Sequence, residues 1–297
     1  MFYLALLACG YSTMAVGKWH LGYAKSAQTP WGRGFQRYTG YLGGSEDYYK
    51  KTSCVDKHNC GVDMTTEGET EGSRLYTNNR TAYSAFEYID QAKDYLTTRD
   101  SEKPFFLYLP LQSVHMPLQV PSQYMDPYRN IIKTHARLTY AGMVSVLDEA
   151  VGNLTNYLKE EKLWDDTIFI FSTDNGGQAY AGGNNLPYRG NKGGYWEGGI
   201  HGVGFVAGGY FEENKKHAAV SHELMHISDW FPTILEATAC SLSDKTSVLD
   251  GTSQWKMLTQ NAPSDRFEIL HNIDPLSTTD GTDNRTFPVG KCYSDAF

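Results

Sequence analysis

Two short segments of the sequence are apolar at almost every position, residues 105–109 and residues 168–171. A strand with one face in water alternates apolar and polar side chains, whereas a strand buried on both faces of a parallel sheet does not. Further strand candidates and helical patterns alternate with these segments: strands at 12–16 and 202–207, helices at 75–98, 135–163 and 223–239. We therefore predict an α/β fold, with a mostly parallel central sheet flanked by helices and long loops over residues 29–63.

The composition is that of a folded protein of one or two domains. The chain has 297 residues, of which 40% are hydrophobic and 13% aromatic, and its formal net charge is −8. A disordered chain has fewer aromatic residues and a larger net charge for its length. The pI near 5.6 argues against the basic surface of a nucleic-acid-binding protein, and no apolar run approaches the roughly 20 residues of a membrane-spanning helix. We therefore predict neither a nucleic-acid partner nor a membrane span.

An acidic turn directly follows the apolar segment at 168–171. Asp174 offers a carboxylate and Asn175 an amide oxygen, and both are hard ligands suited to Ca²⁺ or Mg²⁺. A simple Asp-Asn-Gly turn is the alternative interpretation of the same residues. Asp165 and Asp166 precede this strand and lie about 26 Å away at roughly eight extended residues, so we assign them to a turn rather than to a metal site.

Cationic side chains follow the other strand candidates. Lys18 and His20 alternate after the strand at 12–16, so on an extended chain both point to the same face. Two cations on one face suit an oxyanion such as sulfate or phosphate, although a solvated strand end would show the same pattern. His115, past the strand at 105–109, is a candidate general acid or anion ligand, with a structural loop histidine as the alternative. In open α/β sheets such groups gather at the carboxyl ends of the strands.

In combination, these motifs resemble the type I sulfatases, and within them the arylsulfatase B-like branch. The matching segments follow one another in order along the chain: residues 10–13, 16–22, 40–41, 43–49, 106–109, 111–115, 140–144, 169–177, 181–185, 196–199, 226–230 and 270–275. The resemblance implies an alkaline-phosphatase/sulfatase-like fold that here lacks the family's first strand or strands. It also implies that residues 1–275 form part of a catalytic domain and that residues 276–297 begin a truncated C-terminal subdomain.

The family's sulfate-binding residues carry over to matching positions of this sequence. Asp174 and Asn175 resemble two of the ligands of the active-site Ca²⁺, and Lys18 and Lys192 resemble the two lysines that contact sulfate oxygens. His20 is similar to the histidine that hydrogen-bonds the nucleophile. The physical logic agrees, because a hard cation and two ammonium groups neutralise the oxygens of a sulfate ester as its sulfur is attacked.

The resemblance is incomplete at the nucleophile. His115 resembles the histidine that protonates the leaving oxygen, but the family nucleophile is a formylglycine, made by the formylglycine-generating enzyme from the first residue of Cys/Ser-x-Pro-x-Arg. None of the five cysteines and no serine in this sequence begins that motif. The Asp-Asp pair that completes the family's metal site, near the start of its domain, also has no counterpart here. Two ligands are too few for Ca²⁺, which takes six to eight oxygens.

The resemblance implies a sulfuric ester hydrolase, acting on aryl sulfates or on sulfated carbohydrates such as glycosaminoglycan sugars, whereas the chain as given is expected to be inactive. A fragment of an active enzyme is the preferred explanation, and a secreted, non-catalytic carbohydrate-binding protein is the alternative. A phosphatase or phosphodiesterase of the same superfold is a further alternative. Such enzymes typically bind two metals, whereas here Lys18 and Lys192 would take the place of the second metal, which favours a sulfatase. Glu46, Asp47 and His271 are candidates for the lining of the substrate pocket.

Cysteines and glycosylation sequons indicate an oxidising compartment. Cys54 and Cys60 lie close together in a polar stretch and predict a short-loop disulfide, and Cys240 with Cys292 is a second candidate pair. Asn-x-Ser/Thr sequons occur at Asn79, Asn153 and Asn284. We therefore predict a lysosomal or secreted protein. Residues 1–9 fit either a short secretion signal or a helix, and the resemblance favours the end of a helix.

Overall fold

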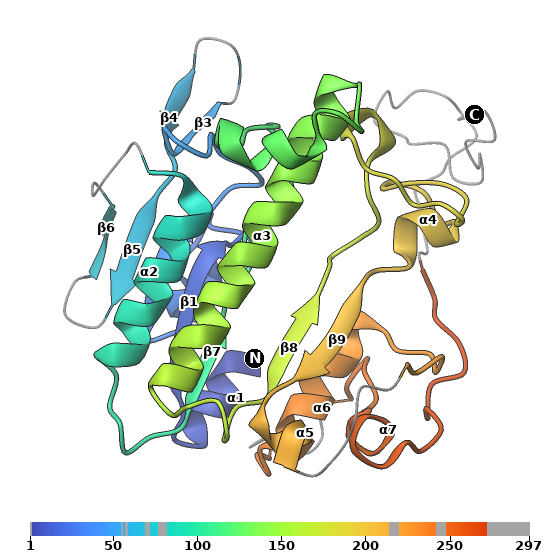
Figure 1. Cartoon of the computed structure of the whole chain (residues 1–297). Helices are drawn as coiled ribbons and strands as arrows, with labels where there is room; N and C mark the ends of the chain where they lie inside the picture. Colours follow the sequence, from blue (N-terminus) through green and yellow to red (C-terminus); the bar gives the residue numbers. More distant parts are fainter. Residues whose placement is uncertain are drawn as a thin grey trace, which may run out of the picture.

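A computed structural model describes residues 2–54, 56, 59–68, 72–76, 82–213, 220–241 and 248–271 (Figure 1). Its centre is a five-stranded sheet in the order β6-β5-β2-β1-β7. The strands are β1 (Ser12–Lys18), β2 (Arg37–Tyr41), β5 (Thr65–Gly68), β6 (Gly72–Leu75) and β7 (Phe105–Tyr108). β2, β1 and β7 run parallel, while β5 and β6 form an antiparallel edge. The predicted α/β class is confirmed, whereas the predicted subdomain at 276–297 lies outside the described residues.

Two long helices cover one face of this sheet (Figure 1). They are α2 (Ser84–Thr97) and α3 (His135–Glu160), which pack against each other and, through α2, against β1 and β2. Apolar side chains of both helices meet Met14 and Val16 of β1 in the main core cluster. The helix predicted at 135–163 is confirmed, whereas the one predicted at 75–98 begins later because β6 occupies its first positions. The predicted N-terminal helix is α1 (Phe2–Ala8).

A second, two-stranded sheet holds β8 (Phe169–Ser172) and β9 (Gly204–Ala207). Both strands were expected in one parallel sheet, but they pair antiparallel with each other and separately from the five-stranded sheet. Among the described strands, β8 pairs only with β9, and β7 pairs only with β1. The side chains of Phe169, Ile170 and Phe171 are consequently half-buried instead of buried on both faces. Phe169 still packs against the core cluster that β7 also contacts, so the two sheets share a core.

A short helix, α4 (Glu197–Ile200), lies in the connection between β8 and β9, and three more described helices follow β9: α5 (Gly209–Glu213), α6 (Trp230–Ala237) and α7 (Trp255–Gln260). The helix predicted at 223–239 is therefore shorter than expected. Asp229 precedes α6 and accepts hydrogen bonds from the backbone amide groups of His226 and Thr252 and from the Arg266 guanidinium. Burial alone would raise the pKa of Asp229, but these bonds outweigh burial and hold it below its usual value. This buried ion pair anchors the last described segment of the chain.

The loops predicted at 29–63 contain a central strand, so that prediction is wrong in part. β2 lies between β1 and β5, and a small hairpin of β3 (Thr52–Cys54) and β4 (Cys60–Val62) follows. Gly40 hides the strand from a pattern search because glycine is uncommon in strands. Here the backbones approach closely, since a Cβ atom on Gly40 would lie 1.9 Å from the Gly17 carbonyl oxygen. The Tyr38 hydroxyl also donates to that carbonyl, at 3.0 Å.

One of the two disulfide predictions is confirmed and the other is wrong. Cys54 and Cys60 are bonded across the β3–β4 hairpin. Cys240 pairs with Cys9 and not with Cys292, and this bond joins the end of α6 to the residue after α1, with Cα atoms 6.0 Å apart. Cys292, Asn79 and Asn284 lie outside the described residues, and Asn153 lies on α3. Within the described part of the chain, no helix combines the length and the apolar character needed to cross a membrane.

Candidate active site

Three strands carry candidate residues to one end of the structure. Lys18 is the last residue of β1, His115 follows β7, and Asp174 follows β8. The Lys18 amide donates to the Pro110 carbonyl oxygen at 2.8 Å, which ties the end of β1 to the segment after β7. Asp174 adds to the effect of burial in raising the pKa of Tyr108, the last residue of β7, so its charge lies near that strand end as well. Strands of two different sheets thus converge at their carboxyl ends.

Lys18 is a half-buried cation whose surroundings are charged. Burial lowers the pKa of its ammonium group, the negative charge of Asp174 raises it, and the positive charge of Lys192 lowers it again. Gly17 allows the end of β1 to pack closely against the segment after β7. It has a φ of +121°, and a Cβ atom there would lie 2.3 Å from the Pro110 carbonyl oxygen. A lysine close to a second lysine is a natural ligand for a multiply oxygenated anion.

His115 is influenced by the same three charges. Burial lowers the pKa of its imidazole, the hydrogen bond to Met116 raises it, Lys18 and Lys192 lower it, and Asp174 raises it. The net effect favours the neutral ring. Its Nδ1 lies 2.8 Å from the Met116 carbonyl oxygen and must therefore donate, which leaves Nε2 as the acceptor of the neutral ring and the donor gained on protonation. The Tyr48 hydroxyl donates to the His115 carbonyl oxygen at 2.8 Å and fixes the backbone.

Lys192 reaches this group from a glycine-rich loop at residues 176–199. The Lys192 amide donates to the Gly177 carbonyl oxygen at 3.2 Å. The Asn185 side chain closes the loop, since its amide oxygen accepts from the Gly177 amide at 2.8 Å and its amide nitrogen donates to the carbonyl oxygens of Gly177 and Gly190. The structure therefore brings Lys18, His115, Asp174 and Lys192 into one electrostatic neighbourhood, named the cation cluster here.

His20 is placed differently from the expectation. β1 ends at Lys18, and His20 has a φ of +49°, so the alternation assumed for an extended chain does not continue to it. The His20 side chain instead lies against Gly44, where a Cβ atom would be 3.0 Å from Nε2. Its proximity to the cation cluster stays a prediction.

Asp174 and Asn175 supply only two oxygen ligands for a metal. The Asn175 amide nitrogen donates to the Gly176 carbonyl oxygen at 2.8 Å, which leaves its Oδ1 available, and the Asp174 carboxylate is exposed. Across the residues that the structure describes, no group of three or more histidine, cysteine, aspartate or glutamate side chains is arranged to hold a metal ion. Ca²⁺ takes six to eight oxygens, so these residues do not form a calcium site by themselves, and no chemical step is assigned to a metal.

A comparison with known protein families identifies the family of the chain. A family model described as Sulfatase matches residues 4–239. The chain belongs to the sulfatase family. The arylsulfatase B-like branch stays a prediction, because relatives of this sulfatase chain come from several branches.

Two curated relatives illustrate the range of sequence identity to this chain. Arylsulfatase J of Mus musculus is 43% identical over 276 residues, which cover 91% of this chain and 44% of the mouse protein. N-acetylgalactosamine-6-sulfatase of Homo sapiens is 26% identical over 281 residues, covering 91% of this chain and 50% of the human protein. This sulfatase chain therefore spans about half the length of these relatives.

Solved structures confirm the fold. The crystal structure of Ps i-CgsB in complex with k-i-k-neocarrahexaose superposes with a TM-score of 0.75 at 28% identity, over 88% of this chain and 58% of that one. The PsFucS1 sulfatase from Pseudoalteromonas sp. gives a TM-score of 0.70 at 21% identity, over 89% of this chain and 56% of that one. The sulfatase chain thus has the alkaline-phosphatase/sulfatase-like fold that the resemblance implied.

Two of the residues expected to line the substrate pocket of this sulfatase have structural partners within the described part of the chain. Glu46 is only 2% exposed, and its carboxyl accepts a hydrogen bond from the Tyr88 hydroxyl at 2.5 Å. Burial raises the pKa of Glu46 to about 8, although the Tyr88 hydrogen bond and the charge of Lys51 act in the opposite direction. Asp47 accepts from the amides of Tyr49 and Lys50 and from the Gln119 side chain, which is a turn-stabilising role.

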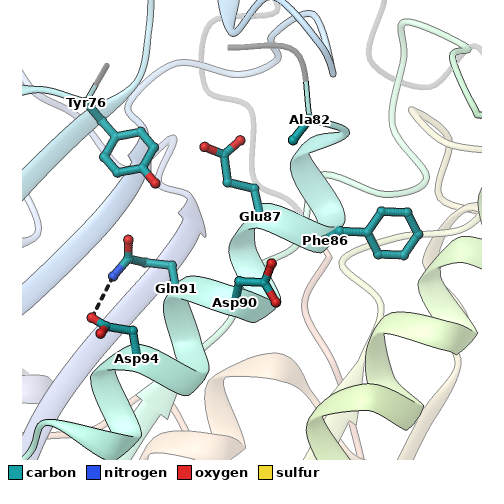
Figure 2. A pocket seen from close by; sticks show the side chains of 7 residues that line it. All are labelled: Tyr76, Ala82, Phe86, Glu87, Asp90, Gln91 and Asp94. Atoms are coloured by element: carbon teal, nitrogen blue, oxygen red, sulfur yellow. Dashed lines mark hydrogen bonds between the residues drawn. The ribbon is translucent and has the colours of Figure 1, made fainter. Parts of the chain in front are cut away.

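A cavity of 290 Å³ lies elsewhere on the sulfatase chain (Figure 2). It is lined by one face of α2 and by Tyr76, and its charged residues are Glu87, Asp90 and Asp94. Figure 2 shows these carboxylates along the same helix, with Gln91 donating to Asp94 at 3.2 Å. An acidic lining repels a sulfate group, and none of the predicted site residues contributes to it.

Sequence reasoning did not single out the residues that shape the glycine-rich loop. Asn185 falls inside a segment that matches the family, but only the structure shows that its side chain holds Lys192 near Gly177. The signal available in the sequence was the concentration of aromatic residues between 180 and 196, which polar loops rarely contain.

Proposed function

We propose that this chain forms the sulfate-recognising part of a sulfuric ester hydrolase. The observation that carries the proposal is the cation cluster at the carboxyl ends of the strands. There the charges of Lys192 and Asp174 affect the pKa of both Lys18 and His115. Membership of the sulfatase family supports a sulfate ester as the ligand.

The residues of the cluster divide into two roles. The ammonium groups of Lys18 and Lys192 bind the non-bridging oxygens of the sulfate. The anion relieves the repulsion by Lys192, which adds to the larger effect of burial in lowering the pKa of Lys18. In this proposal the His115 ring gains a proton on Nε2 when the negatively charged sulfate ester binds, and then donates that proton to the oxygen of the departing alcohol, since its Nδ1 proton is engaged by the Met116 carbonyl oxygen. As the bond between sulfur and the alcohol oxygen breaks, that oxygen gains negative charge, and the proton from His115 neutralises it.

Hydrolysis needs groups that these 297 residues do not supply. Sulfatases generally use Ca²⁺ and a formylglycine nucleophile, whose Cys/Ser-x-Pro-x-Arg motif is not in this sequence. The full-length protein would therefore be a client of the formylglycine-generating enzyme. A non-catalytic role as a secreted carbohydrate-binding protein stays the alternative.

The substrate class follows from the relatives and the compartment from the cysteines. We infer a sulfated carbohydrate or an aryl sulfate, since the curated relatives are named as sulfatases of aryl groups and of N-acetylgalactosamine. The disulfides Cys54–Cys60 and Cys9–Cys240 support a lysosomal or secreted location. The paired lysines favour sulfate over the two-metal chemistry of a phosphatase of the same superfold.

Sulfate binding tests this proposal directly. Lys18→Ala and Lys192→Ala should each weaken binding of inorganic sulfate by about tenfold or more in calorimetry, because each removes a charge-assisted hydrogen bond. Lys103→Ala is the matched control, since Lys103 is exposed, pairs with Asp100 and precedes β7 at the opposite end of the strand. Equal affinity in all four proteins would refute the proposal. The wild-type chain should show no turnover of 4-nitrocatechol sulfate, and measurable turnover would contradict the absence of a nucleophile.

A further inference from the structure

The glycine-rich loop beside the cation cluster exposes aromatic rings that a folded protein normally buries. Tyr180 is 75% exposed, Tyr195 57% and Tyr188 44%. Isolated exposed rings are common, but several on one short loop mark a binding surface. This loop also carries Lys192, so the rings belong to the surroundings of the proposed sulfate site.

Tyr195 lies beside a histidine ring from a distant segment of the chain. Its ring is nearly parallel to that of His271, with centroids 6.5 Å apart and planes inclined by 13°. His271 is also exposed and comes from the segment that the buried Asp229–Arg266 pair anchors. Trp196, in contrast, has the Arg189 guanidinium 4.2 Å from its ring centroid, so one of its faces is covered. Tyr195 and His271, named the ring pair here, are both exposed and their ring planes are nearly parallel.

The ring pair lies within reach of the sulfate-binding lysine. Tyr195 is three residues from Lys192, and a three-residue span is at most about 11 Å long. The loop is also compact, because the Gly194 amide donates to the Asn191 carbonyl oxygen at 3.1 Å and the Gly199 amide to that of Trp196 at 2.7 Å. The ring pair is therefore close enough to Lys192 for one ligand to contact both.

The polar groups around the ring pair suit a sugar better than a simple aryl group. The exposed side chains of Glu197 and His201 lie 2.8 Å apart at hydrogen-bond distance, two and six residues beyond Tyr195. A carboxylate and an imidazole can bind sugar hydroxyls, while the C–H face of a pyranose packs against the electron-rich face of an aromatic ring. The structural neighbour Ps i-CgsB was crystallised with a carrageenan-type hexaose, which is an observation on that protein and agrees with this chemistry.

We propose that Tyr195 and His271 form a stacking platform for the sugar ring of a sulfated saccharide whose sulfate is bound by Lys192. This inference rests on the proposed function and names its substrate as a saccharide. It assigns recognition of the sugar to the glycine-rich loop and to the segment at residues 266–271, and recognition of the sulfate to the cation cluster.

The test compares two probes on the intact chain by calorimetry: N-acetylgalactosamine 6-sulfate and inorganic sulfate. Tyr195→Ala should weaken binding of the sulfated sugar by about fivefold, as expected for the loss of one aromatic contact, and leave inorganic sulfate unchanged. Tyr195→Phe should retain the sugar affinity, because the ring and not the hydroxyl forms the platform. Tyr180→Ala, which removes a more exposed ring outside the ring pair, is the matched control, and thermal melts verify that each variant is folded.

The possible outcomes separate this inference from the proposed function. If Lys192→Ala weakens both probes but Tyr195→Ala weakens neither, the sulfate site stands and the platform is refuted. If Tyr195→Ala weakens both probes equally, Tyr195 acts only on loop shape and the platform is again refuted. If Tyr195→Ala weakens binding of 4-nitrocatechol sulfate, used as a third probe, as much as binding of the sulfated sugar, the assignment to a saccharide is overturned. If inorganic sulfate does not bind to the wild-type chain, the proposed function itself fails.

Discussion

Glu46 is a carboxylic acid in the interior that keeps its proton near neutral pH. The buried surroundings raise the pKa of its carboxyl to about 8, well above the ordinary value of 4.5. The nearest cation, Lys51, is itself buried and is already paired with Glu87 at 3.2 Å. Lys51 also donates to the carbonyl oxygens of Tyr48 and Ala82, at 2.8 and 2.6 Å. Position 46 matches a family segment, which made it a candidate for the substrate pocket, but its burial could not be read from the sequence.

This protonation makes stability depend on pH. Because the folded chain holds a proton on Glu46 that the unfolded chain releases above pH 4.5, the free energy of unfolding should fall as pH rises from about 5 to about 8, and the contribution of Glu46 should level off above pH 8. Glu46→Gln keeps an oxygen acceptor for the Tyr88 hydroxyl but cannot titrate, so its free energy of unfolding should depend less on pH. Urea unfolding of both proteins at pH 6 and pH 9 measures the difference. Identical pH slopes would show that Glu46 is ionised in the folded protein.

At the scale of elements, predictability followed the strength of the local pattern. β7, β8 and α3 were located from the sequence because long apolar or helical patterns define them. β2 was missed because Gly40 breaks the strand pattern, and its position depends on close contact with Gly17, which is distant in sequence. The pairing of β8 with β9 was also unpredictable, since an antiparallel partner is chosen by the fold and not by either strand alone.

The candidate site also contains residues that the sequence identified and contacts that only the structure shows. Lys18, His115, Asp174 and Lys192 were identified from motifs, and their common neighbourhood agrees with that identification, while their chemical roles stay predictions. The contacts that hold the glycine-rich loop join residues of one loop through backbone atoms, and such contacts leave no sequence period to detect. The position of His20 could not be predicted because its backbone leaves the extended conformation after β1.

Asn185 should control the order of the glycine-rich loop. Asn185→Ala removes its bonds to Gly177 and Gly190, so it should lower the free energy of unfolding by about 1–2 kcal/mol and weaken sulfate binding through Lys192. Hydrogen exchange of the amides at Gly177 and Lys192 should become faster. Asn184→Ala is the control, because the Asn184 side chain accepts only a local bond from the Leu186 amide among the bonds found here. If exchange is equally slow in both variants, the loop is held by other contacts.

At the scale of the whole molecule, two disulfides constrain the chain to very different extents. Cys54 and Cys60 are 6 residues apart, whereas Cys9 and Cys240 are separated by 231 residues and join α1 to the end of α6. A disulfide restricts the unfolded chain more strongly when it closes a longer loop. The Cys9–Cys240 pairing therefore affects the stability of the whole fold, while the hairpin disulfide acts locally.

Removing each disulfide tests this difference. Cys240→Ser should lower the free energy of unfolding by about 5 kcal/mol and Cys60→Ser by about 2 kcal/mol, following the dependence on loop length. A non-reducing peptide digest should show Cys9 linked to Cys240 in the wild-type protein. Recovery of a Cys240–Cys292 peptide instead would contradict the pairing, and equal losses of stability would contradict the loop-length argument.

The separation of β7 from β8 has a consequence for how this chain behaves in solution. One edge of each strand has no strand partner among the described residues, so its peptide groups are available to any extended segment that approaches. Such contact would also bury more of the half-buried phenylalanines of β8, which is favourable because it removes apolar surface from water. Self-association would then arise from the backbone and not from a specific surface, and the electrostatic repulsion between chains of net charge −8 is the force that opposes it.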